Sequence, residues 1–130
     1  MVHTGSCLCG AVRFSTSGAL RDVVYCHCVQ CRKQTGHYVA ATASADTDLA
    51  IEGDENLTWF SASADARRGF CKVCGSLLFW KGTGRARTSI MAGSLDGASG
   101  LKGLNHIFVA EKGDYYEIDD GLPQLSGYED

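Results

Sequence analysis

The amino-acid sequence predicts a mainly β protein, a single domain of short antiparallel strands with little helix. Its 130 residues include 16 glycines and one proline, and no long stretch of good helix formers. This composition is typical of many short strands joined by tight turns. Residues 11–14, 57–60 and 107–110 also alternate between apolar and polar side chains. Such alternation predicts strands with one buried face.

The expected strands follow one another along the whole chain. Each is a short run with strand-forming residues, bounded by residues that favour turns. We expect strands at residues 10–16, 23–28, 37–43, 49–52, 57–61, 68–71, 76–80, 88–92, 106–111 and 115–118. One helical turn is expected at residues 32–36, because Gly36 readily takes the left-handed conformation that ends a helix. The glycine-rich residues 81–85 are expected to form a hairpin turn, since the strand-to-helix context of a phosphate-binding loop is missing.

The composition is that of a globular chain with one core. Apolar residues make up 45% of the sequence, which is enough for one domain over residues 1–130. The 12 Lys and Arg residues stand against 15 Asp and Glu, for a formal net charge of -3. We therefore expect no nucleic-acid partner. No secretory leader or membrane-spanning stretch is visible, so we expect a cytoplasmic protein without a membrane contact. The oligomeric state is left open.

The cysteines are the most informative residues. There are seven, an odd number that excludes complete internal pairing in disulfides. They form three clusters: Cys7 and Cys9; Cys26, Cys28 and Cys31; Cys71 and Cys74. Such close spacing is typical of metal sites, and all-thiolate sites favour zinc, with iron as the main rival. Redox chemistry at the Cys-x-x-Cys pairs is the weaker alternative.

The number of thiolates predicts two different sites. A closed structural zinc takes four protein ligands, and a zinc with an open position takes three. The contiguous Cys26, Cys28 and Cys31 suit the three-ligand site, which leaves two pairs for the four-ligand site. On a strand, residues i and i+2 point to one face, so Cys7 and Cys9 could present two thiolates together, and Cys26 and Cys28 could do likewise. The segment from Cys71 to Gly75 is instead expected to form a knuckle turn in which both sulfur atoms face one ion. The four ligands would be Cys7, Cys9, Cys71 and Cys74.

The histidines have less defined roles. His27 lies between two expected ligands and, on a strand, points to the opposite face, so it is expected to pack or to form hydrogen bonds. His37 and His106 open expected strands. Both are expected to be structural, with a role at the open zinc position as the alternative.

Several motifs resemble the glutathione-dependent formaldehyde-activating enzyme family. Residues 5–14 (GSCLCGAVRF) resemble its opening Cys-x-Cys-Gly strand, and residues 26–33 (CHCVQCRK) its Cys-His-Cys-x-x-Cys-Arg segment. Residues 68–78 (RGFCKVCGSLL) resemble its Arg-x-Phe-Cys-x-x-Cys-Gly-Ser block. Residues 93–96 (GSLD) and 106–109 (HIFV) resemble later markers. The chain departs from many relatives at residues 113–116 (GDYY), where they carry a Trp-Tyr pair.

The resemblance implies a β-tent fold with two zinc ions. One would be structural, on Cys7, Cys9, Cys71 and Cys74, and the other would be held by Cys26, Cys28 and Cys31. It also implies a carbon–sulfur lyase acting on S-hydroxymethylglutathione, the adduct of glutathione and formaldehyde. The alternative is a zinc-stabilised binding or chaperone module without catalysis, because related folds serve such roles.

If the protein is an enzyme, the cysteines of the three-ligand site act as ligands of a catalytic zinc. This ion would bind a small thiol such as glutathione and favour its thiolate. Arg32 adjoins this cluster and is a candidate contact for a carboxylate of glutathione, although most surface arginines are simply solvated. Two zinc ions per chain are expected, and because three-ligand sites lose metal more readily than four-ligand sites, the occupancy of the second site in isolated protein is left open.

Overall fold

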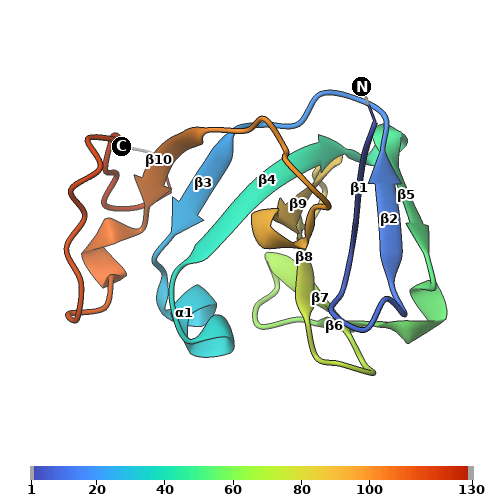
Figure 1. Cartoon of the computed structure of the whole chain (residues 1–130). Helices are drawn as coiled ribbons and strands as arrows, with labels where there is room; N and C mark the ends of the chain where they lie inside the picture. Colours follow the sequence, from blue (N-terminus) through green and yellow to red (C-terminus); the bar gives the residue numbers. More distant parts are fainter. Residues whose placement is uncertain (1, 129–130) are drawn as a thin grey trace. The chain divides into compact units, whose positions relative to one another are not determined.

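The computed structural model describes residues 2–128, and strands dominate it, as the sequence predicts (Figure 1). The chain forms two compact units. The first contains the chain up to Arg21 and Thr42–Gly100, and the second contains Asp22–Ala41 and the chain from Leu101 onward. Among the described residues there is one α-helix, and it is too short to cross a membrane.

The first unit contains two sets of antiparallel strands. One is a three-stranded sheet in the order β1-β2-β5, formed by His3–Ser6, Arg13–Thr16 and Leu49–Glu52. The other is a run of neighbouring strands in the order β6-β7-β8-β9, formed by Leu57–Phe60, Ala66–Cys71, Leu77–Gly82 and Arg87–Met91. Short 3-10 turns at Asp46–Asp48 (η1), Asp54–Asn56 (η2) and Ala92–Ser94 (η3) connect them.

The core of the first unit includes two of its cysteines. Cys7 and Cys71 are buried with five apolar residues, Val12, Phe14, Leu78, Phe79 and Ile90. The rings of Phe14 and Phe79 meet edge to face with centroids 5.5 Å apart. A change at either buried sulfur therefore also disturbs the packing of this core.

The second unit places one helix between two strands. Strand β3 (Val23–Cys26) leads into α1 (Val29–Thr35), and the chain returns in β4 (Val39–Ala45), whose first residues pair antiparallel with β3. Strand β10 (Gly103–Ile107) pairs with β3 in parallel and is followed by the 3-10 turn η4 (Val109–Glu111). This parallel pair is an exception to the antiparallel arrangement that the sequence predicts.

Two features around the cysteines differ from the sequence prediction. Strand β3 ends at Cys26, and Cys28 is the N-cap of α1, so these two cysteines do not share a strand face. Cys7 and Cys9 lie in the turn after β1, again outside a strand. The expected helical turn begins three residues earlier than predicted, as α1, and Gly36 ends it with a φ of 87°.

Candidate metal centres

Four cysteines of the first unit meet at one point. The Sγ atoms of Cys7, Cys9, Cys71 and Cys74 all lie within 4.8 Å of one another. Cys9 Sγ is 3.6 Å from Cys7 Sγ and 3.8 Å from Cys71 Sγ. A tetrahedral zinc with bonds of about 2.3 Å holds its sulfur ligands about 3.8 Å apart. The spacing of these sulfur atoms therefore fits a zinc ion.

Two turns bring these sulfur atoms together. Cys7 and Cys9 lie in the β1–β2 turn, where the backbone N–H of Val12 donates to Cys7 Sγ at 3.3 Å. Cys71 ends β7, and the turn to β8 closes with a bond of 2.8 Å from Gly75 N to Cys71 O. Gly75 has a φ of 81°, a conformation that a residue with a Cβ rarely adopts. The backbone N–H of Leu8 donates to Ser76 Oγ at 3.1 Å, which links the two turns.

Two thiols of this group, those of Cys74 and Cys9, differ in their pKa. Hydrogen bonds from the side chain and backbone of Ser76 lower the pKa of Cys74 to about 5. The backbone N–H of Ala11 lowers the pKa of Cys9, but burial and the neighbouring thiols outweigh it and raise this pKa to about 11. The lowered pKa of Cys74 favours its thiolate, which is the form that binds a cation. A cation that replaces the remaining protons would bind here.

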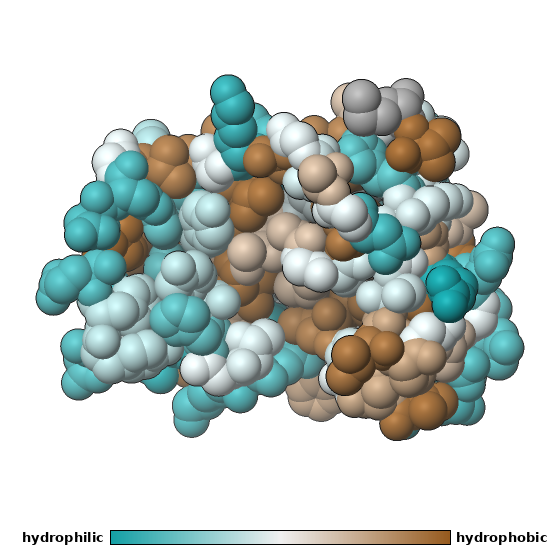
Figure 2. Space-filling view, in the orientation of Figure 1, coloured by the Kyte–Doolittle hydropathy of each residue, from teal (hydrophilic) through white to brown (hydrophobic). Residues whose placement is uncertain are grey.

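Two exposed apolar side chains lie between the cysteines of the four-cysteine group. Leu8, between Cys7 and Cys9, is 90% exposed, and Val73, between Cys71 and Cys74, is 63% exposed. Figure 2 shows apolar surface gathered at the lower right, over the turn between β1 and β2. The residues between the cysteines thus face outward while two of the sulfur atoms are buried in the core.

Three cysteines of the second unit form the other group. The Sγ atoms of Cys26, Cys28 and Cys31 lie within 4.8 Å of one another. Cys26 ends β3, Cys28 is the N-cap of α1, and Cys31 is the buried residue of that helix. The backbone N–H of Cys31 donates to Cys28 Sγ at 3.3 Å. Hydrogen bonds with Cys28 and Cys31, together with burial, raise the pKa of Cys26.

The cysteines are grouped four and three, the division that counting ligands predicts, and none of the seven, all within residues 2–128, forms a disulfide. No histidine, aspartate or glutamate of the described chain joins either group. Three thiolates leave one position of a tetrahedral ion for water or a ligand. The three-cysteine group is therefore the one with the donor set of an open site.

Glu111 forms two hydrogen bonds with the helix that carries Cys31. The carboxylate of Glu111 accepts a hydrogen bond of 2.9 Å from the backbone N–H of Val29. Arg32 Nε donates to the carbonyl oxygen of Glu111 at 3.2 Å. Glu111 belongs to η4, which follows Phe108 with a φ of 55°. The position of the Arg32 guanidinium is thus set by a backbone contact on η4.

A network of histidines and tyrosines lies next to the three-cysteine group. His27, between Cys26 and Cys28, is fully buried and hydrogen-bonds through Nδ1 to Tyr116 Oη. Its Nε2 lies 2.8 Å from His106 Nδ1, and His106 Nε2 lies 2.7 Å from Asp120 Oδ2. Burial, and then the proximity of His106, lowers the pKa of His27 to about 4. The bond from His106 lowers the pKa of Asp120.

His37 is engaged in the same region. Its Nδ1 lies 2.5 Å from Tyr115 Oη, and its ring centroid lies 4.9 Å from that of Tyr116. His27, as expected, is hydrogen-bonded rather than a member of the cysteine group. No local pattern in the sequence indicated that Tyr116 and Asp120, which lie far along the chain from His27, would bond to His27 and His106.

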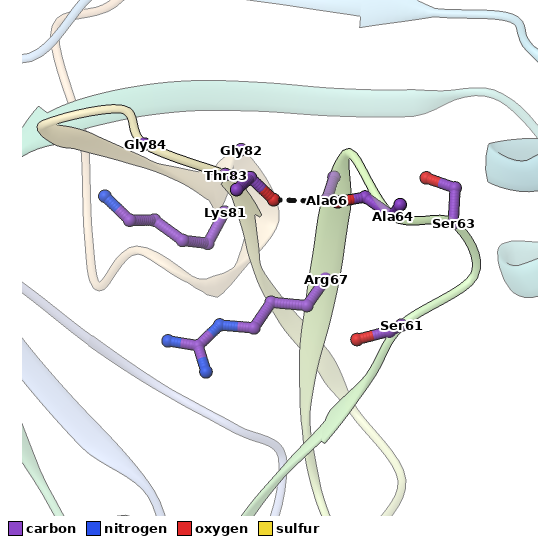
Figure 3. A pocket seen from close by; sticks show the side chains of 9 residues that line it. All are labelled: Ser61, Ser63, Ala64, Ala66, Arg67, Lys81, Gly82, Thr83 and Gly84. Carbon is purple, nitrogen blue, oxygen red and sulfur yellow. Dashed lines mark hydrogen bonds between the residues drawn. The ribbon is translucent and has the colours of Figure 1, made fainter.

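The first unit also has a polar pocket of about 400 Å³. It lies where β7 begins and β8 ends, at the opposite end of these strands from Cys71 and the turn that carries Cys74. Figure 3 shows Arg67 and Lys81 extending in the same direction across it, and Thr83 Oγ1 donating to Ala64 O at 3.0 Å. Lys81 Nζ donates to Asp46 and to the carbonyl oxygens of Arg85 and Arg87. The ammonium group of Lys81 is thus already satisfied within the chain.

Comparisons with known proteins agree with the motifs. The sequence profile of the glutathione-dependent formaldehyde-activating enzyme family matches residues 2–111. The chain is 35% identical over 88 residues to a Halomonas elongata protein named "Putative glutathione-dependent formaldehyde-activating enzyme". This match covers 61% of the chain and 55% of the relative, so the chain spans about half the length of that protein.

Two further similarities cover more of the compared proteins. An uncharacterized lyase of Schizosaccharomyces pombe is 26% identical over 117 residues, a match that covers 89% of this chain and 85% of the relative. The crystal structure of a Rhodobacter sphaeroides protein has a TM-score of 0.61 and 27% sequence identity to this chain. That similarity covers 75% of this chain and 91% of the other.

Proposed function

The chain belongs to the glutathione-dependent formaldehyde-activating enzyme family, and on that premise we propose that it is a zinc-dependent carbon–sulfur lyase. Its substrate would be an adduct of a thiol and an aldehyde, such as S-hydroxymethylglutathione, and its site would be the group of Cys26, Cys28 and Cys31. The observation that supports this proposal is the presence of three converging thiols with no fourth histidine, cysteine or carboxylate ligand among residues 2–128. Such a donor set suits a site at which a substrate binds.

The donor sets also support the choice of metal. Four sulfur atoms at tetrahedral spacing, Cys7, Cys9, Cys71 and Cys74, would hold a structural zinc. Cys26, Cys28 and Cys31 would hold the second ion. When bound there, zinc supplies one piece of chemistry, which is to stabilise the deprotonated form of a thiol and so make it both a nucleophile and a leaving group.

Arg32 is the residue we propose for substrate binding. Its Nε is used by the carbonyl oxygen of Glu111, which holds the guanidinium beside the start of α1. The two terminal nitrogens of the guanidinium would then donate to a carboxylate of glutathione. This contact would orient the thiol of the substrate toward the three cysteines that lie on the same segment as Arg32.

A second candidate function is a zinc-stabilised binding module without catalysis. The exposed Leu8 and Val73 favour it, because they form apolar surface beside the four-cysteine group. Such surface is typical of contacts with another protein. In this case both cysteine groups would hold structural metal ions. A residue of another chain would then fill the fourth position at the three-cysteine group.

An exchange experiment tests the proposed activity. The transfer of labelled formaldehyde into and out of its glutathione adduct is followed for wild type and Cys28→Ser, at equal concentrations of folded protein and against the uncatalysed background. We expect wild type to exceed the background and Cys28→Ser to fall to it, because a ligand of the second ion is lost. Gln30→Ala, an exposed change between Cys28 and Cys31, should retain the wild-type rate.

Wild-type exchange at the rate of buffer alone would contradict the lyase assignment. It would leave the binding module as the remaining candidate. A Cys28→Ser protein that exchanges as fast as wild type would instead place the activity elsewhere in the chain.

A further inference from the structure

Four side chains of the second unit form an unbroken chain of hydrogen bonds that the proposed metal chemistry does not use. Tyr116 Oη bonds to His27 Nδ1, His27 Nε2 to His106 Nδ1 at 2.8 Å, and His106 Nε2 to Asp120 Oδ2 at 2.7 Å. The two histidines in the middle are 0% and 2% exposed, whereas the carboxyl end, the Asp120 side chain, is 44% exposed. The chain therefore connects a buried position to solvent.

With both imidazoles neutral, the carboxylate of Asp120 at one end sets the direction of the protons in this chain. A carboxylate only accepts hydrogen bonds, so His106 Nε2 carries a proton and donates it to Asp120. A relay of protons along these bonds requires both imidazoles to be neutral, since two charged rings with centroids 5.0 Å apart would repel each other. Each neutral imidazole has one donor and one acceptor nitrogen. His27 Nε2–H thus donates to His106, and the hydroxyl of Tyr116 donates to His27.

Tyr116 lies beside the segment that carries the three cysteines. Its ring stacks on His27 at 5.6 Å and meets His37 at 4.9 Å, and these two residues flank α1 on either side. Lys112 fixes the backbone there, since its Nζ donates to Tyr116 O at 2.6 Å and lies 4.7 Å from the center of the ring. Because the hydroxyl proton points at His27, the lone pairs of the phenolic oxygen are directed elsewhere and can accept a bond from a ligand.

We propose that Tyr116 is a catalytic residue of the three-cysteine site, that its oxygen takes the hydroxyl proton of the substrate, and that His27, His106 and Asp120 pass a proton to solvent. This inference rests on the proposed lyase activity. In that reaction the O–H bond of the S-hydroxymethyl group breaks, its electron pair forms the carbonyl of formaldehyde, and the C–S bonding pair stays on the thiolate.

The proton balance is complete within these four residues. As Tyr116 Oη gains the substrate proton, its own proton moves to His27 Nδ1, and the proton on His27 Nε2 moves to His106 Nδ1. The proton on His106 Nε2 moves to Asp120, which releases it to water. Each imidazole gains one proton and loses one, so neither becomes charged. In the synthesis direction the same steps run in reverse and protonate the oxygen of the adduct.

Steady-state kinetics of adduct cleavage test this role. Removing a general base typically costs about 100-fold or more in rate, so we expect kcat of Tyr116→Phe to fall about 100-fold at unchanged zinc content and melting temperature. Tyr115→Phe is the matched control, because Tyr115 also bonds to a histidine, His37, but lies outside the chain of bonds. It should stay close to wild type. Asp120→Asn, at an exposed position, should lower kcat at least about tenfold and change the solvent isotope effect on kcat.

Binding of two stable thioethers gives a readout that does not depend on turnover. S-(2-hydroxyethyl)glutathione and S-propylglutathione are similar in size but differ in a hydroxyl group. Wild type should bind the hydroxylated compound about tenfold more tightly by calorimetry, as a net hydrogen bond of about 1.4 kcal/mol requires. Tyr116→Phe should bind the two equally.

The outcomes separate the two proposals. If wild type catalyses cleavage but Tyr116→Phe keeps its kcat and its preference for the hydroxylated compound, the role of Tyr116 is overturned while the lyase assignment stands. If wild type neither cleaves the adduct nor binds either thioether, the lyase assignment is overturned, and the role of Tyr116 with it.

Discussion

At the scale of single residues, the cysteines combine packing and chemistry. Cys7 and Cys71 belong to the core of the first unit, whereas Cys9 is exposed and Cys74 is half-buried. The same four sulfur atoms lie at the spacing of a tetrahedral site. A metal at this point would therefore join two turns that the chain itself links through only a few hydrogen bonds, and its loss would loosen the core.

Cys7→Ser tests this dependence. We expect the zinc content to fall by about one ion per chain and the free energy of unfolding to fall by about 4 kcal/mol or more, because the loss of a structural metal is among the largest single-residue effects. Leu8→Ala is the control, since Leu8 lies between two proposed ligands but is exposed. Metal analysis and denaturant unfolding are the measurements. A Cys7→Ser protein with full zinc content would contradict the four-cysteine site.

At the scale of elements, α1 is a short helix whose two ends are held by different means. Cys28 caps its start with a sulfur that accepts from Cys31 N, and the carboxylate of Glu111 accepts from Val29 N. Gly36 ends it in the left-handed conformation, with the cap N–H bonded to Arg32 O. These contacts place Cys28 and Cys31 on one turn of backbone, where their sulfur atoms face the end of β3.

Gly36→Ala tests the helix end. The added Cβ at Gly36 would meet no atom within 4 Å, so only the φ of 87° opposes it. We expect a loss of about 1 kcal/mol in the free energy of unfolding, the usual cost of a left-handed residue with a Cβ. Gly93→Ala is the matched control, because its site is equally open but its φ is not positive. Equal stabilities of the two variants would show that the end of α1 carries no strain.

Most elements were predictable because their residues have a local preference. The strand at Leu49–Glu52 matches the prediction at both ends, and the helix stop at Gly36 follows from glycine chemistry. Strand β1 was missed, because His3–Ser6 is polar and lacks alternation, and pairing with β2 creates it. The strand predicted at residues 115–118 is wrong, since contacts between side chains hold this segment.

The candidate site was predictable only in part, because only some of its features depend on local sequence. Short spacings revealed the cysteine groups, and their division followed from the number of ligands that zinc accepts. The prediction that paired cysteines share a strand face is wrong, because Cys7 and Cys9 lie in a turn and Cys28 caps a helix. The contacts of Tyr116 and Asp120 with His27 and His106 depend on long-range packing that no local pattern encodes.

At the scale of the whole molecule, metal changes both charge and stability. The formal net charge is -3 before metal binding. Zinc with four thiolates carries -2 and zinc with three carries -1, so filling both sites adds -3 and gives about -6. Each compact unit contains one cysteine group. A small β chain of this kind would gain from metal the stability that a limited core cannot supply.

The most direct test of the account is the number of metal ions per chain, measured by elemental analysis together with titration of native thiols. We predict two zinc ions per chain and few reactive thiols, with the ion at Cys26, Cys28 and Cys31 lost first under mild chelation. Metal-free protein that folds and melts normally, with seven thiols open to reagent, would contradict the claim that both cysteine groups hold metal.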